Sequence, residues 1–177
     1  EEAVSMAKAA DVAVVFVATL SHEGGDRGSL SLDVGCVPDT RPGRQGVGTP
    51  CVGNANAQNA MVSAIAAAQP NTVVVMSVPG AVLTPWADEV PAIVTNFMPG
   101  QAAGSAIADI LFGKVNPSAR LPLTFPNTDN DQNMSPAQYP GLPDPEAPLY
   151  ANYTEGLFVG YRYYDKHGIE PAFAFVK

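Results

Sequence analysis

The hydrophobic residues of this chain form short, uninterrupted runs that predict β-strands. The run DVAVVFVAT covers residues 11–19, NTVVVMSV covers 71–78 and PAIVTNF covers 91–97. Continuous β-branched runs of this length are typical of strands covered on both faces, as in a parallel sheet. We therefore expect residues 11–19 to form a strand that is buried on both faces, and the other two runs to be strands of the same sheet.

Segments with helical spacing lie between and around these runs. Residues 1–11 resemble the second half of an amphipathic helix, residues 56–68 are alanine-rich and stop before Pro70, and a helix of small residues is predicted from residue 100 to Gly113. Helices that alternate with strands imply crossover connections and a largely parallel sheet. The pattern therefore predicts the α/β class. Because a helix and a strand-like run are cut off at the two ends, we also expect a fragment of a longer protein.

The last third of the chain has a different pattern. Residues 126–157 are rich in Pro, Asn and Asp and lack periodicity, which predicts a long loop. Residues 157–165, LFVGYRYYD, alternate aromatic and other side chains and predict an edge strand. We expect one domain over 1–177, with 33–55 and 126–157 as long loops or insertions.

Charge and length exclude several classes of partner. Seventeen acidic residues against nine basic ones give a formal net charge of −8, which is the wrong sign for binding nucleic acid or an anionic membrane surface. The apolar runs are about half as long as the roughly 20 residues that a bilayer crossing requires. We therefore expect neither a nucleic acid nor a membrane as partner.

Two cysteines and two sequons bear on the compartment. Cys36 and Cys51 flank a Pro/Gly/Arg-rich insert, and a disulfide between them would close a loop of about 15 residues, worth about 3 kcal/mol in the chain-entropy model. The alternative is two unpaired thiols. N-glycosylation sequons lie at Asn133 and Asn152. A disulfide and glycans would both fit an extracellular protein.

The segment SHEGGDRGSL, residues 21–30, is the candidate for chemistry. It leaves the carboxyl end of the first predicted strand, where open α/β sheets bind ligands. A solvated charged turn, a metal site on His22, Glu23 and Asp26, and a proton-transfer role for Glu23 are all open from the residues alone. Its glycine spacing matches neither common phosphate-binding motif. Asp26 and Arg27 are adjacent, so a charge pair between them could hold the loop.

This loop and three later segments resemble the C-terminal α/β domain of glycoside hydrolase family 3. The loop EGGDRGSLSL follows the first predicted strand, and the later segments follow in the same order and spacing as in the family: QPNTVVVMSVPGAVLTPWADEVPAIV, FMPGQAAGSAIADILFGKVNPSARLPLTFP and YTEGLFVGYRYYDKHGIEPAFAF. The resemblance covers nearly the whole chain outside 33–55 and 127–148. It implies a three-layer α/β sandwich with a mostly parallel, mixed sheet, incomplete at both ends.

The resemblance also implies a function. In this family a barrel domain carries an aspartate nucleophile, and the sandwich domain carries a glutamate acid/base, which matches Glu23 here. The implied activity is that of a retaining exo-β-glycosidase, a β-glucosidase that releases terminal β-D-glucosyl residues from β-glucosides or oligosaccharides. The alternatives are a β-xylosidase of the same family and a non-catalytic carbohydrate-binding or interdomain scaffold module. Without the barrel, the isolated chain is expected to be inactive.

The remaining candidates have smaller roles. His22, Asp26 and Arg27 are predicted to support the loop or bind substrate, with Arg27 turned toward Asp26. Trp86 and Tyr161 could stack on a sugar, although packing is the favoured interpretation for both. The expected partners are the substrate and the N-terminal barrel of the same protein, with no cofactor and no metal.

Overall fold

The computed structural model of the chain describes most of its length as two compact units, Glu1–Ala119 and Arg120–Lys177. The residues that it describes are 1–19, 21, 27–33, 57–146 and 149–176. The interpretation of residues 1–177 as one domain stays a prediction.

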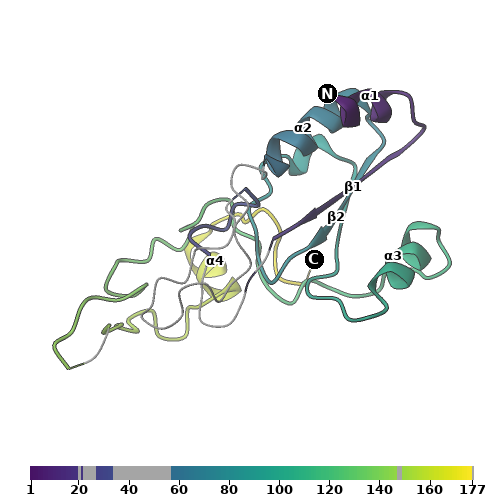
Figure 1. The fold of residues 1–177 in the computed structure, drawn as a ribbon. Helices are drawn as coiled ribbons and strands as arrows, with labels where there is room; N and C mark the ends of the chain where they lie inside the picture. The colour runs from purple at the N-terminus through teal and green to yellow at the C-terminus, as the bar shows by residue number, and fades with distance from the viewer. Residues whose placement is uncertain (20, 22–26, 34–56, 147–148, 177) are drawn as a thin grey trace. The chain divides into compact units, whose positions relative to one another are not determined.

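The first unit is built on a three-stranded parallel sheet. Its strands are β1 (Ala13–Ala18), β2 (Thr72–Ser77) and β3 (Ala92–Thr95), in the order β1-β2-β3 (Figure 1). The three apolar runs of the sequence therefore form strands as predicted, and the α/β class with a parallel sheet is confirmed.

Helices lie on either side of this sheet (Figure 1). α1 (Glu2–Lys8) packs against α2 (Gln58–Ala68), which contacts β1 and β2, while α3 (Ala103–Leu111) follows β3 and lies on the other side of the strands (Figure 1). A short 3₁₀ turn, η1 (Ala87–Glu89), precedes β3. α2 is rich in alanine, the strongest helix former, and turns its buried Val62 toward the core. These helices agree with the predicted segments.

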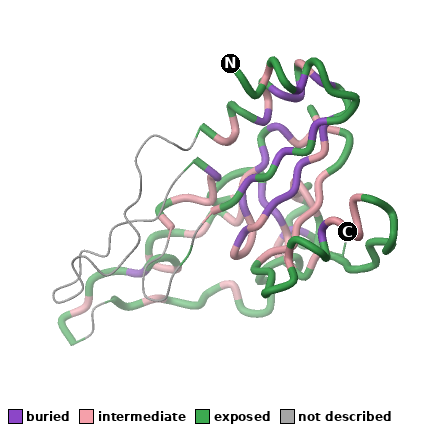
Figure 2. Tube along the Cα trace, turned by 45° about the vertical axis from the view of Figure 1, so that its right-hand side comes forward, coloured by how far each residue is buried: buried purple, intermediate pink, exposed green. Residues whose placement is uncertain are grey.

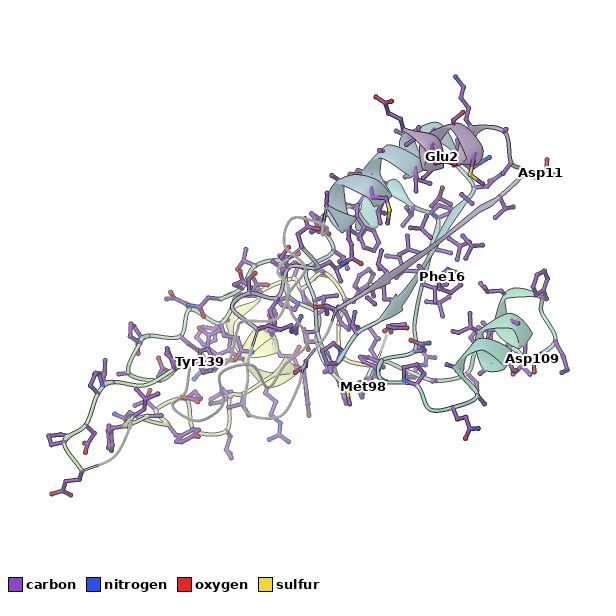
Figure 3. The ribbon with its side chains drawn as sticks, in the orientation of Figure 1. Glu2, Asp11, Phe16, Met98, Asp109 and Tyr139 are labelled. Atoms are coloured by element: carbon purple, nitrogen blue, oxygen red, sulfur yellow. The ribbon has the colours of Figure 1, made fainter. Side chains whose placement is uncertain are left out.

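The burial of β1 differs from the prediction. Val15 and Val17 are buried, but Val14 and Phe16, the latter labelled in Figure 3, are 42% and 62% exposed. The expectation that this strand is covered on both faces is therefore wrong for the described structure. β1 lies at the edge of the sheet, whereas Val74, Val75 and Met76 in the central β2 are at most 2% exposed. The buried residues, purple in Figure 2, gather along the strands.

The far end of α2 is tied to α1 by a buried amide. Gln69, which is 8% exposed, donates from Nε2 to the carbonyl oxygens of Ala7 and Ala10. The Thr72 hydroxyl donates to the Gln69 carbonyl at 2.6 Å. These bonds fix the end of the sheet at which the strands begin. The predicted functional loop lies at the opposite end, where the strands finish.

In the part of the second unit that the structure describes, the one helix is α4 (Tyr161–His167). The predicted edge strand over 157–165 is therefore wrong. Gly160 and Gly168 bound the helix with positive φ angles of 56° and 62°, and the left-handed Gly168 ends it as C-cap glycines commonly do. Lys166 and His167 are basic residues in the last turn, where a positive charge interacts favourably with the negative end of the helix dipole.

The rest of the second unit consists of turns joined by isolated bridges. Phe125 pairs with Phe173 in an antiparallel bridge, and their rings meet edge to face with centroids 6.1 Å apart. Leu142 pairs with Tyr150 in the same way. Among the described residues of either unit, no helix is both long enough and apolar enough to cross a bilayer.

Candidate functional site at the carboxyl edge of the sheet

The carboxyl ends of the three strands lie at one edge of the sheet, because the strands are parallel. β1 ends at Ala18 and β2 ends at Ser77 beside it, while Thr19 continues the pairing by donating to the Ser77 carbonyl at 3.3 Å. The Ser77 hydroxyl donates to Asn96 Oδ1 at 2.9 Å, which joins the ends of β2 and β3. The predicted loop leaves this edge directly after β1.

Several predicted site residues lie outside the described residues. They are His22, Glu23, Asp26, Cys36 and Cys51. Their assignments as catalytic glutamate, loop-support residues and disulfide pair stay predictions.

The returning flank of the loop, residues 27–33, runs beside the segment that follows β2. Arg27 Nη2 donates to the carbonyl oxygen of Ala81 at 3.0 Å, and the amide of Leu83 donates to the Leu30 carbonyl at 3.0 Å. Ser31 and Leu83 form a parallel bridge. Arg27 thus joins the loop to the chain after β2. Its pairing with Asp26 stays a prediction, because Asp26 lies outside the described ranges.

Gln58, the first residue of α2, joins both flanks of the loop. Its side-chain amide accepts from the Ala18 amide and donates to the Ala18 carbonyl, each at 2.9 Å. Nε2 also donates to the Leu32 carbonyl at 2.8 Å. One side chain therefore holds the residue where the loop leaves β1 and a residue where the chain returns.

Asn59, the next residue, joins the returning flank to the core. Its backbone amide donates to Asp33 Oδ1 at 3.0 Å, and its Nδ2 donates to Asp33 Oδ2 at 2.9 Å and to the Ser31 hydroxyl at 3.2 Å. Its Oδ1 accepts from the indole nitrogen of Trp86 at 2.9 Å. Gln58, Asn59 and Asp33 are therefore prominent at this edge, and the sequence reasoning missed all three.

Trp86 has no exposed surface. Its ring offers no open face on which a sugar could stack in this structure, and its polar edge is occupied by Asn59. The position contributes packing and one hydrogen bond, as aromatic residues with a polar atom do when they are buried.

The remaining candidates lie in the second unit. The Tyr161 ring stacks on Phe175 with centroids 4.8 Å apart, which occupies one of its faces, so its sugar-stacking role stays a prediction. Asn133 and Asn152 are exposed, as glycosylation sites must be, and their modification also stays a prediction. In the described part of the chain, no three His, Cys, Asp or Glu side chains are grouped so that they could hold a metal ion.

The family of this chain is decided by comparison with known proteins. The model of the family described as "Glycosyl hydrolase family 3 C-terminal domain" matches residues 1–161. The chain belongs to this family. The resemblance stated from the sequence segments is therefore confirmed.

Relatives of this family 3 domain are β-glucosidases. The chain is 41% identical over 170 residues to β-glucosidase B of Emericella nidulans, an alignment that covers 93% of the chain and 18% of the relative. It is 40% identical over 177 residues to thermostable β-glucosidase B of Acetivibrio thermocellus, with coverage of 98% and 20%. The chain thus spans about a fifth of the length of these curated relatives.

A solved structure agrees with the family 3 fold. The chain is similar to DesR, a β-glucosidase from Streptomyces venezuelae crystallised in complex with D-glucose, with a TM-score of 0.79 and 36% identity. The match covers 98% of this chain and 19% of that one. The similarity supports the α/β architecture of the described residues.

Proposed function

We propose that this chain is the C-terminal domain of a retaining exo-β-glucosidase and that Glu23 is the catalytic acid/base of that enzyme. The observation that carries the proposal is the similarity to named β-glucosidases over 93% and 98% of the chain. A loop that contains Glu23 and leaves the carboxyl edge of a parallel sheet is where such chemistry is expected.

The chemistry divides between two carboxyl groups. A retaining glycosidase needs a nucleophile and an acid/base about 5–5.5 Å apart on opposite sides of the anomeric carbon. In the proposed enzyme the nucleophile lies in a barrel domain outside this chain. Glu23 donates its proton to the departing glycosidic oxygen and then, as a carboxylate, takes a proton from the water that releases glucose.

The described flanks of the loop fit this role. A general acid must be held within hydrogen-bonding reach of the oxygen that it protonates. Arg27 on Ala81 and the Leu30–Leu83 bond anchor the returning flank to the segment after β2. A purely solvated turn would need no such anchors.

Loss of Glu23 should affect substrates according to their leaving groups. In the full-length enzyme, Glu23→Ala should lower kcat/KM for cellobiose by about 10²–10⁴-fold, because its leaving group needs protonation. The kcat/KM for 2,4-dinitrophenyl β-glucoside should fall far less, because its leaving group departs as an anion and needs no proton. The measurement is steady-state kinetics on both substrates.

Glu89→Ala is the matched control, since Glu89 is an exposed carboxylate of η1. It should leave both rates unchanged. An equal loss on both substrates in Glu23→Ala would show that Glu23 has a structural role only. The same measurements with β-xylosides test the xylosidase alternative. If the wild-type enzyme hydrolyses β-xylosides faster than β-glucosides, the proposed activity is that of a β-xylosidase.

A further inference from the structure

We propose that Gln58 and Asn59, at the start of α2, are positioning residues that hold the Glu23 loop at both of its ends. The inference rests on the proposed function of Glu23. It concerns the described residues on either side of the loop, which Gln58 and Asn59 bind directly.

Gln58 acts on β1 as a neighbouring strand would. Ala18 turns its amide and carbonyl to the outer side of β1, since alternate residues of a strand bond to opposite sides and the amides that donate toward β2 are those of Ala13 and Thr19. The Gln58 side chain satisfies both outer groups of Ala18 at 2.9 Å. Two antiparallel hydrogen bonds to one residue fix the direction in which the chain leaves the strand.

The third bond of Gln58 closes the base of the loop. The same Nε2 that binds the Ala18 carbonyl also donates to the Leu32 carbonyl at 2.8 Å. Leu32 is 1% exposed, so it is a fixed point of the core rather than a mobile partner. The distance between the two ends of the loop is therefore set through one amide.

Asn59 adds a second connection to the core. Both hydrogens of its amide and its carbonyl oxygen are used, by Asp33, Ser31 and the buried indole of Trp86. A fully satisfied polar network of this kind specifies a single arrangement of its members. The returning flank is thereby fixed to Trp86, which has no exposed surface.

This geometry predicts a catalytic effect as well as a structural one. Displacement of a catalytic group by about 1 Å can cost about 10²-fold in rate. Because Glu23 serves protonation, a loosened loop should harm substrates with poor leaving groups and spare activated ones. A residue that only stabilises the fold would affect both substrates alike.

The experiment compares amides at the two ends of α2 in the full-length enzyme. Gln58→Ala should lower kcat/KM for cellobiose by about 10–10²-fold and that for 2,4-dinitrophenyl β-glucoside by less than about threefold. Gln69→Ala is the matched control, because Gln69 is a hydrogen-bonded amide at the opposite end of the helix. Gln69→Ala should lower Tm and should change kcat/KM for the two substrates by the same factor.

Asn59→Asp is a second variant that keeps the size of the side chain. It retains an acceptor for Trp86 but replaces the donor to Asp33 with a negative charge. It should show the same dependence on leaving group as Gln58→Ala. Folding of each variant is checked by circular dichroism.

A double-mutant cycle separates this inference from the proposed function. Glu23→Ala combined with Gln58→Ala should be no slower on cellobiose than Glu23→Ala alone, since Gln58 acts through Glu23. In one outcome, the loss of kcat/KM in Glu23→Ala depends on the leaving group, but Gln58→Ala and Asn59→Asp lower kcat/KM equally for both substrates, as Gln69→Ala does. The positioning role is then wrong, and the proposed function of Glu23 is retained. If Glu23→Ala itself shows no such dependence, the proposed function fails first.

Discussion

The two compact units of the chain obtain their order in different ways. The first unit, Glu1–Ala119, has a core of aliphatic side chains on β2 and the elements around it. The second, Arg120–Lys177, has one short helix among its described residues and is joined largely by polar side chains that bind nearby backbone. The difference shows that the pattern of hydrophobic residues predicts helices and strands that pack in an apolar core. It does not predict turns that are held by polar side chains.

Asp131 is the clearest case of polar order in the second unit. Its carboxylate accepts from the amides of Asn127 and Thr128 at 2.7 and 2.9 Å and from the Thr128 hydroxyl at 2.6 Å. The Tyr164 hydroxyl also donates to it, at 3.4 Å. One carboxylate therefore fixes a turn and connects it to α4.

The aromatic residues allow the two units to be followed separately. Trp86 is the single tryptophan of the chain and lies in the first unit, while all six tyrosines lie in the second. Tryptophan fluorescence thus reports on the first unit, and the near-ultraviolet circular dichroism of tyrosine reports on the second. Both can be recorded in one urea titration of the 177-residue chain.

The largest effect is expected in the aliphatic core. Val74→Ala should lower the free energy of unfolding followed by Trp86 by about 2–3 kcal/mol, because Val74 is fully buried in the central strand. Val14→Ala is the matched control, since Val14 lies on the exposed face of β1 and should cost less than about 1 kcal/mol. Equal losses at the two positions would contradict the one-sided burial of β1.

A smaller effect is expected in the second unit. Asp131→Asn should lower the free energy of unfolding followed by tyrosine by about 1 kcal/mol, because the amide replaces a charged acceptor of several hydrogen bonds. The Trp86 transition should not move. A shift of both transitions together would show that the two units unfold as one.

The same carboxylate predicts a pH dependence. Burial raises the pKa of Asp131, but hydrogen bonds from Thr128, Asn127 and Tyr164 outweigh it and leave the pKa below its ordinary value. A folded pKa below the unfolded one means that the stabilisation is complete above the ordinary aspartate pKa of about 4 and is lost as pH falls through the folded value. Acid should therefore destabilise the second unit more in the wild type than in Asp131→Asn.

Tyr164 contributes at the opposite end of the pH scale. Its burial and the adjacent Asp131 carboxylate raise its pKa to about 12. The tyrosinate absorbance that develops near this pH should be absent in Tyr164→Phe.

Much of the first unit was predictable because its strands are continuous apolar runs separated by segments with helical spacing. The runs at 71–78 and 91–97 became β2 and β3, and the alanine-rich segment became α2 within about two residues of the predicted start. The exposed face of β1 was not predictable from the run itself. A continuous apolar sequence specifies a strand, but its coverage depends on which elements lie beside it.

The helix α4 was predicted wrongly because the aromatic spacing of residues 161–164 suits a strand as well as a helix. The signals that favour a helix were present in the sequence. Gly168 stands where a C-cap glycine belongs, and Lys166 and His167 precede it. These end signals specify the helix, whereas the alternation of aromatic residues is compatible with either structure.

At the candidate site the sequence indicated the loop but not its supports. Arg27 was predicted to turn toward Asp26 and hold the loop, whereas its described partner is the Ala81 carbonyl, and the pairing with Asp26 stays a prediction. Gln58 and Asn59 were missed because they lie far from the loop in sequence and meet it only through the crossover that brings α2 to the end of β1. Two amides at the start of an otherwise alanine-rich helix were the available signal.

The most direct test of the role of Glu23 is the product formed when azide replaces the missing carboxylate. Glu23→Ala in the full-length enzyme is incubated with 2,4-dinitrophenyl β-glucoside and sodium azide, and the product is identified by nuclear magnetic resonance. If Glu23 is the acid/base, azide accelerates turnover and yields β-glucosyl azide, because azide attacks the glycosyl-enzyme from the side that Glu23 vacates. Unchanged turnover with glucose as the product, or an α-azide, would contradict the assignment of Glu23 as the acid/base.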